Sequence, residues 1–255
     1  MKFIKIPLFL IWRLWFGILM FVSLFLFFPF LLIFSFKEEH YHVFWKFARM
    51  LSRILVYGMG FRLSFKSNEN IDPNKSYMYC PNHASLLDPF VLIALSKRPI
   101  VFVGKKELAK IPIFGFFYKR TAIMVDRTSV ESKKRVFKMA KKRLQNGVSM
   151  AIFPEGLVPT EDIVLAPFKH GAFSLAIEFE IPIVPQVYYD CKRFFSWDIF
   201  KGRPGVLRVY QLSFIETKGL SVAKDMNALK NKTFNLIHGY LEKDFKYMKD
   251  TNRKR

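Results

Sequence analysis

The chain has 255 residues, and its 41 Lys and Arg outnumber 20 Asp and Glu to give a formal net charge of +21. Because 51% of the residues are hydrophobic, the composition excludes an intrinsically disordered chain and is sufficient for a buried core. Two cysteines exclude a disulfide framework, no Cys and His group has zinc-site spacing, and the positive charge indicates an anionic partner: nucleic acid, a phospholipid surface or a phosphorylated substrate.

Residues 1–36 form an apolar N-terminal segment that contains ten of the 30 Phe and only three charges. From Leu14 to Phe36, 23 consecutive residues carry no charge, and about 20 such residues cross the hydrocarbon core of a bilayer. No small-residue cleavage site precedes Lys37, which disfavours a cleaved signal peptide. A buried core helix is the alternative. Pro29 permits a kink, so a helical hairpin within one leaflet competes with a full span.

A second helix is predicted over residues 41–57, because apolar side chains recur there at spacings of three and four. The apolar face contains Phe44, Phe47, Leu51 and Ile54, and basic residues recur on another face. Such a helix lies at a membrane boundary, with Trp45 and Tyr57 as interfacial anchors, or it packs on a protein core.

Beyond residue 60, short β-type runs alternate with helical patterns. The predicted strands cover residues 61–66, 76–80, 100–103, 122–125, 148–153, 183–189 and 205–214. The predicted helices cover residues 85–96, 129–146, 169–179 and 221–246. This alternation predicts an α/β domain with a largely parallel sheet flanked by helices.

In such a sheet, candidate functional residues lie just beyond the carboxyl ends of the strands. Asn82, His83 and Asp88 follow the strand that ends at Cys80. Imidazole accepts protons near neutral pH, and a carboxylate on its second ring nitrogen fixes the tautomer. Pairing requires His83 to precede the helix, because five residues of regular helix would separate it from Asp88 by about 140°. A histidine with a purely structural partner is the alternative.

Other strand exits also carry polar residues. Glu155 and Gly156 follow the strand that ends at Phe153, and their alternative interpretation is an ordinary turn with an exposed glutamate. Lys105 follows a third strand, and Arg127 follows a fourth.

The motifs N-H-A-S-L-L-D, V-D-R, F-P-E-G and I-P-I-V-P resemble, in this order, four motifs of glycerolipid acyltransferases. The chain resembles the bacterial 1-acylglycerol-3-phosphate (lysophosphatidic acid) acyltransferase branch of this family. The resemblance covers about residues 60–215 and includes K-K-E-L-A-K-I-P-I-F-G between the first two motifs. It implies an α/β catalytic domain, expected over residues 61–255, and an N-terminal membrane-associated helical pair over residues 1–60.

The resemblance also implies roles for individual residues. His83 is the expected general base, and Asp88 is its orienting partner. His83 would deprotonate a lipid hydroxyl that attacks the thioester of acyl-CoA or an acyl carrier protein, with no metal and no further cofactor. The expected substrate-binding residues are Asn82, Lys105, Arg127, Glu155, Gly156 and Lys169.

One departure concerns the acceptor. Many relatives continue F-P-E-G with Thr-Arg-Ser, whose Arg binds the acceptor phosphate, but here Leu157 and Val158 occupy the Thr and Arg places. Arg127, Lys105 and Lys169 would then bind the phosphate, or the acceptor is a lysolipid other than lysophosphatidic acid.

Two basic clusters complete the sequence: seven basic residues in 133–143 and six in 243–255. We expect them to contact anionic lipid, or an acyl carrier protein or CoA; a solvated face is the alternative. A membrane-anchored nucleic-acid-binding protein would explain the charge but not the strand-exit motifs, so we expect no nucleic-acid partner. Because acyl thioesters are made in the cytosol, we expect the catalytic domain on the cytoplasmic side of the cytoplasmic membrane.

Overall fold

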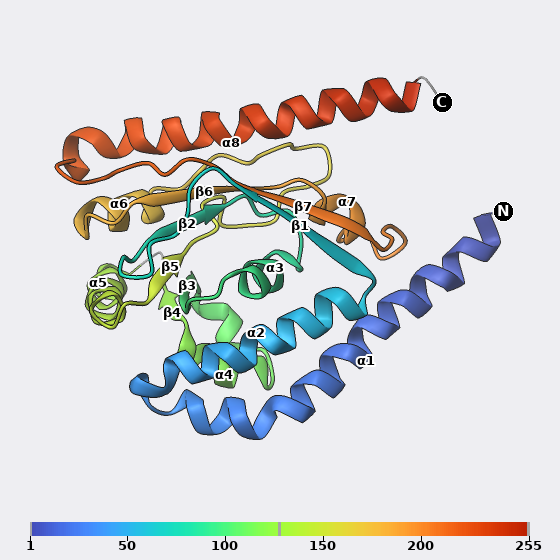
Figure 1. The fold of residues 1–255 in the computed structure, drawn as a ribbon, viewed down its shortest axis with the longest axis horizontal. Coiled ribbons are helices and arrows are strands. Elements are labelled where there is room, and N and C mark those ends of the chain that lie inside the picture. Colours follow the sequence, from blue (N-terminus) through green and yellow to red (C-terminus); the bar gives the residue numbers. More distant parts are fainter. Residues whose placement is uncertain (1, 127–128, 254–255) are drawn as a thin grey trace.

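A computed structural model describes residues 2–126 and 129–253 of the chain (Figure 1). Its strands form a seven-stranded sheet in the order β1-β7-β6-β2-β5-β3-β4. The paired strands are parallel except for β6 and β7, which are antiparallel. The strands are β1 (Phe61–Ser67), β2 (Met78–Pro81), β3 (Ile100–Lys105), β4 (Ile123–Val125), β5 (Ser149–Ala151), β6 (Ile183–Tyr188) and β7 (Gly205–Gln211). The predicted α/β fold with a largely parallel sheet is therefore confirmed.

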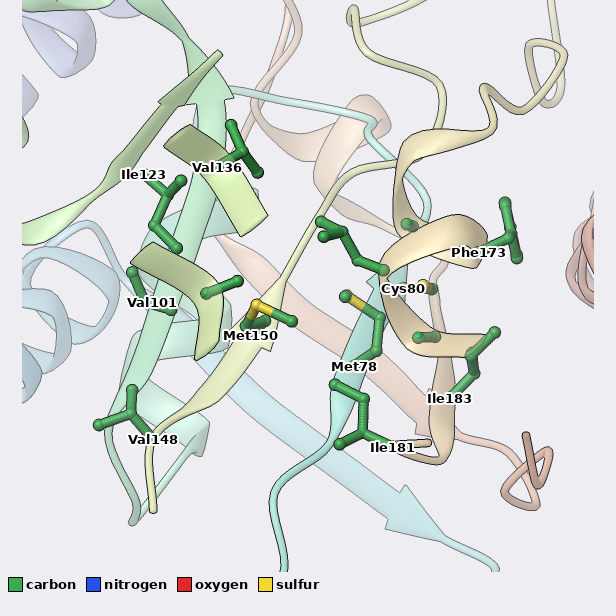
Figure 2. Close-up of a cluster of buried hydrophobic side chains, with 14 of the residues drawn as sticks. Met78, Cys80, Val101, Ile123, Val136, Val148, Met150, Phe173, Ile181 and Ile183 are labelled. Carbon is green, nitrogen blue, oxygen red and sulfur yellow. The ribbon is translucent and has the colours of Figure 1, made fainter. Parts of the chain in front are cut away.

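Both faces of the sheet are buried, as the alternation of side chains along β2 shows. Met78 and Cys80 lie in one apolar cluster, together with Met150 and Phe173 (Figure 2). Tyr79 lies in a second cluster on the opposite face. Because successive strand residues point to opposite faces, one apolar strand supplies both cores.

Helices cover these faces, with α6 and α8 on one side and α2 and α3 on the other (Figure 1). The helices after β1 are α3 (Asp88–Leu95), α4 (Phe114–Thr121), α5 (Val130–Gln145), α6 (Gly171–Glu178), α7 (Cys191–Phe194) and α8 (Val222–Arg253). Two short 3-10 helices, η1 (Glu38–His40) and η2 (Lys106–Lys110), complete the elements. Periodicity did not predict α4 and α7, since helices of eight and four residues are too short to show a repeated apolar stripe.

The N-terminal segment forms a helical hairpin of α1 (Lys2–Ser35) and α2 (Tyr41–Gly58). Pro29 lies inside α1 and does not end it. Phe47 of α2 stacks on Phe30 and Phe34 of α1, with ring centroids 4.7 and 5.8 Å apart. Residues Ile6–Ser35 are long and apolar enough to cross a membrane, and only 17% of their most apolar window is buried. Most of α1 therefore lies outside the protein core.

Helix α2 packs on the protein core, which was one of its two expected positions. Trp45 is buried against α3, and its Nε1 donates to the Ser96 carbonyl over 3.2 Å. Its prediction as an interfacial anchor is therefore wrong, because this indole is inside the protein. Ile54, expected on the apolar face, is 38% exposed, and Tyr57 is also exposed.

The basic run on α5 is only partly a solvent-facing surface. Lys134, Lys138 and Lys141 are exposed. Arg143 is instead buried: its Nε lies 3.0 Å from Glu38 Oε1, and its guanidinium lies over the Tyr41 ring. This arginine joins α5 to the hairpin rather than facing a partner. The basic residues of 247–255 lie outside the described side chains.

Candidate active site

The predicted strand exits meet at one edge of the sheet. Strands β2, β5 and β3 are parallel neighbours, so the segments after Pro81, Ala151 and Lys105 leave the sheet on the same side. This arrangement brings His83 and Phe153 together, with their rings stacked at a centroid distance of 4.2 Å.

His83 and Asp88 form the central contact of this edge. His83 lies before α3, Asp88 is the first residue of that helix, and His83 Nδ1 is 2.9 Å from Asp88 Oδ2. This is the geometry that pairing was expected to require. The His83 side chain is 20% exposed and the Asp88 side chain is fully buried. One imidazole edge is therefore held by a buried carboxylate while the residue stays open to solvent.

Backbone amides stabilise the negative charge of Asp88. Its Oδ2 also accepts hydrogen bonds from the backbone N–H groups of Ala84 and Ser85, at the N-terminal end of α3. Amide donors and the helix dipole both favour an anion at this position. In the tautomer with its proton on Nδ1, His83 donates a hydrogen bond to Asp88 Oδ2, which leaves the lone pair of the neutral imidazole on Nε2.

Among the side chains that the structure describes near this pair, none is an activated nucleophile. Burial raises the pKa of the Cys191 thiol well above its usual range, and the charge of Asp88 raises it further. Burial also raises the pKa of the Cys80 thiol. Ser85 is fully buried and donates to the Phe195 carbonyl over 2.6 Å. These groups are structural, as expected for Cys80 and Ser85.

Asn82 and Glu155 are buried and bind backbone groups. The Asn82 amide donates to the Tyr188 carbonyl over 3.2 Å and accepts from the Tyr188 N–H over 2.7 Å, which ties the exit of β2 to the end of β6. Glu155 Oε1 accepts from His83 N over 2.5 Å, and Oε2 accepts from Ala166 N over 2.8 Å. Burial raises the pKa of Glu155 to about 7, although both amide bonds act in the opposite direction.

A pocket of about 530 Å³ opens beside Ala84, the neighbour of His83. Lys105, Lys192 and Lys201 line it, together with the apolar side chains of Leu157, Val158 and Trp197. A second pocket of about 420 Å³ shares Ala84 and extends toward Tyr189 and α8. Cations and apolar side chains thus lie together next to the His83–Asp88 pair.

The three lysines differ in their surroundings. Lys192 Nζ donates to the carbonyls of Thr160 and Ile163, and burial lowers its pKa. Lys201 is paired with Glu161 and Asp198. Among the described residues, Lys105 has no ion-pair partner, and it is exposed.

The other predicted site residues lie at the periphery or outside the description. Arg127 lies outside the described residues. Gly156 adopts a φ of 70°, which favours glycine and turns the chain after Glu155. Lys169 is exposed before α6, and its backbone N–H donates to the Pro154 carbonyl over 2.8 Å. Sequence reasoning missed Lys192 and the 196–201 segment, which follow no recognised motif.

Fold and site together define a class: an α/β protein with a mostly parallel sheet, a His–Asp pair at its edge and a lysine-lined pocket beside it. A sequence model of the family described as Acyltransferase matches residues 62–189. The chain therefore belongs to the Acyltransferase family.

Curated relatives agree with this assignment. Over 176 residues the chain is 30% identical to the 1-acyl-sn-glycerol-3-phosphate acyltransferase of Cocos nucifera, which covers 67% of this chain and 55% of that protein. Over 116 residues it is 34% identical to the protein of the same name from Helicobacter pylori, covering 45% and 49%. The aligned region thus spans about half the length of these relatives.

A solved structure shares the fold. The crystal structure of the 1-acyl-sn-glycerophosphate (LPA) acyltransferase PlsC from Thermotoga maritima superposes with a TM-score of 0.76 at 20% identity. The superposition covers 95% of this chain and 97% of that one.

Proposed function

We propose that this protein transfers a fatty acyl chain from acyl-CoA or an acyl carrier protein to the free hydroxyl of 1-acylglycerol-3-phosphate, giving phosphatidic acid for phospholipid synthesis. The observation that carries the proposal is the 2.9 Å contact between His83 and the buried Asp88, beside a pocket lined by Lys105. The names of the aligned relatives support the acceptor.

In this reaction His83 acts as a general base. Its Nε2 takes the hydroxyl proton while the hydroxyl oxygen attacks the thioester carbonyl carbon. The carbon–sulfur bond then breaks, and the imidazolium returns the proton to the leaving thiolate. Asp88 stabilises the imidazolium, a role that a carboxylate partner plays in related dyads and triads. General base catalysis contributes about 10²–10⁴-fold in rate.

Glu155 acts in this proposal through His83 and not on the substrate. Glu155 is 1% exposed, and both of its carboxylate oxygens accept hydrogen bonds from backbone N–H groups. One of those amides belongs to His83, so the carboxylate fixes the backbone that carries the base. We therefore assign Glu155 a positioning role.

Lys105 is the cation best placed for the acceptor phosphate, because it lines the pocket and is exposed. Leu157 and Val158 line the same pocket, and they occupy the places of the Thr and the phosphate-binding Arg found in many relatives. A lysine recognises phosphate as a point charge and lacks the bidentate geometry of arginine. A different lysolipid acceptor is therefore the second candidate function, favoured by these two apolar side chains.

We also propose that the exposed face of α1 lies in the cytoplasmic leaflet of the cytoplasmic membrane, beside the basic domain surface. Both halves of this helix touch the rest of the protein: Trp12 Nε1 donates to the Met59 carbonyl, and Phe28 packs on Phe117 of α4. If α1 crossed the whole bilayer, Met59 and α4, which contact its two halves, would have to enter the hydrocarbon core. Insertion into one leaflet avoids that cost.

The proposal is tested with one labelled acyl-CoA and a panel of lysolipid acceptors that differ only in the headgroup. We expect lysophosphatidic acid to be the best acceptor and His83→Ala to lower kcat at least 10²-fold while the protein still folds. Asp88→Asn should lower kcat as well, because it removes the charge that stabilises the imidazolium. Full activity in the His83 variant would refute the mechanism, and preference for another headgroup would refute the acceptor.

A further inference from the structure

The segment between α7 and β7 exposes apolar side chains next to the candidate site. Within residues 196–201, Trp197, Ile199 and Phe200 are 63%, 49% and 47% exposed. Trp197 also lines the 530 Å³ pocket, as Leu157 does. We call residues 196–201 the pocket lip. Large apolar side chains that are exposed together are typical of an interaction surface, and one of these three also lines the pocket.

The N-terminal helix holds the pocket lip in place. Arg13 Nη2 donates to the carbonyls of Ser196, Asp198 and Lys201 over 2.6, 3.2 and 2.8 Å. The Arg13 guanidinium also lies 4.0 Å from the ring centroid of Phe195. Arg13 is the one charged residue within the apolar stretch Ile6–Ser35. A charge there is costly in a lipid environment, and the lip carbonyls compensate it.

Glu161, in the loop after β5, also binds the lip. Lys201 Nζ lies 2.7 Å from Glu161 Oε2, and Ser196 Oγ donates to Glu161 Oε1 over 2.5 Å. The pocket lip is therefore bound both by Arg13 of α1 and by Glu161 of the loop after β5, and these contacts hold its position.

Apolar side chains of α1 near Arg13 are also exposed. Ile11 and Leu14, the near neighbours of Arg13, are 62% and 64% exposed. Figure 1 shows the N-terminal half of α1 passing below α7 and the loop that leads into β7. The Arg13 hydrogen bonds therefore bring the lip next to a helix whose apolar side chains are largely exposed.

We propose that the pocket lip is a second lipid-contacting element, and that Ile199, Phe200 and Trp197 enter the same leaflet as α1. The partner is the phospholipid bilayer, because the lip is hydrogen-bonded to an exposed apolar helix and carries a tryptophan, the residue type enriched at membrane interfaces. The lysolipid acceptor then passes from the bilayer into the pocket between Leu157 and Trp197. This inference rests on the proposed function for its substrate.

The first test compares Ile199→Ser/Phe200→Ser with wild type, since neither residue lines the pocket. The acceptor is supplied in two forms with the same headgroup: a long-chain lysolipid in phosphatidylglycerol vesicles, and a soluble short-chain lysolipid below its critical micelle concentration. We expect the double variant to lose at least fivefold in rate with vesicles and less than twofold with the soluble acceptor. Phe65→Ser, which alters a 44% exposed residue on β1, is the matched control and should change neither rate.

A second test does not depend on activity. Full-length protein is reconstituted with vesicles of brominated phospholipid, and the fluorescence of Trp197 is obtained as wild type minus Trp197→Phe. Quenching of this difference signal is expected. An unquenched signal, or equal rate losses on both acceptors, overturns the lip proposal. Absence of wild-type acyl transfer to any lysolipid, with Trp197 still quenched, would overturn the proposed function alone.

Discussion

Three hydrogen bonds meet at Asp88 Oδ2, from His83 Nδ1 and from the amides of Ala84 and Ser85. Two more meet at Glu155, from the amides of His83 and Ala166. Between them, these two buried carboxylates bind both the side chain and the backbone of His83. A base held at both points loses little conformational entropy when it reaches the reactive geometry.

Glu155 gives a prediction about stability and pH. Burial raises its pKa from 4.5 to about 7, so the folded protein binds this proton more tightly than the unfolded chain does. The resulting stabilisation is complete below pH 4.5 and is lost as the pH rises through about 7. We expect wild type to lose ~1–3 kcal/mol more than Glu155→Gln between pH 5 and pH 8.

The measurement is denaturant unfolding of both proteins at the two pH values, in one detergent. Groups that titrate identically in the two proteins cancel in the double difference. An equal loss of unfolding free energy in both would show that Glu155 keeps an ordinary pKa.

Among the elements, η2 and α4 approach each other more closely than a side chain permits. Gly115, in the first turn of α4, is buried, and its N–H donates to the Ile111 carbonyl over 2.7 Å. A Cβ atom at this position would lie 2.3 Å from the backbone oxygen of Ala109. This glycine allows α4 to fold back on η2.

We expect Gly115→Ala to destabilise the protein by ~1–3 kcal/mol, the usual range for overpacking a tight contact. The backbone oxygen of Ala109 has no rotamer that relieves the clash. Gly239→Ala in α8 is the control, because no atom lies within 4 Å of its added Cβ. Alanine should stabilise α8 there by about 0.5–1 kcal/mol. The melting temperatures of wild type and both variants are measured by thermal unfolding. Equal melting temperatures for Gly115→Ala and Gly239→Ala would contradict the expectation.

At the scale of the whole molecule, one ion network joins three distant parts of the chain. Arg208 of β7 contacts Asp190 before α7 at 2.8 Å and Asp244 of α8 at 2.8 Å. Asp190 is buried and also contacts Arg193. Arg208 therefore joins the C-terminal helix α8 to β7, the strand that pairs antiparallel with β6. Asp244 of α8 also lines the pocket that reaches Tyr189.

Removing Arg208 should cost more than removing Asp244. Arg208→Ala leaves the Asp190 carboxylate buried with fewer donors, for an expected loss of ~1–3 kcal/mol. Asp244→Ala removes a more accessible partner and should cost below ~1 kcal/mol. Urea unfolding measures both changes. The reverse order would show that Asp190 does not depend on Arg208.

The sequence by itself determined the strands, the longer helices and the order of the motifs at the strand exits. Those features depend on local periodicity and on the rule that parallel strands end at one edge, which is why His83 and Asp88 could be located before their contact was seen. The apolar N-terminal helix follows equally from composition, because no core of this size buries so long an uncharged run.

Only the tertiary structure decided what the side chains between motifs contact. Trp45 is inside the protein, Glu155 binds two amides, and Arg13 holds a loop 183 residues away. Lys192 and the pocket lip reach the site from segments without a motif. Such contacts depend on how elements that are far apart in sequence pack together in space. A local sequence pattern does not show which of these elements become neighbours.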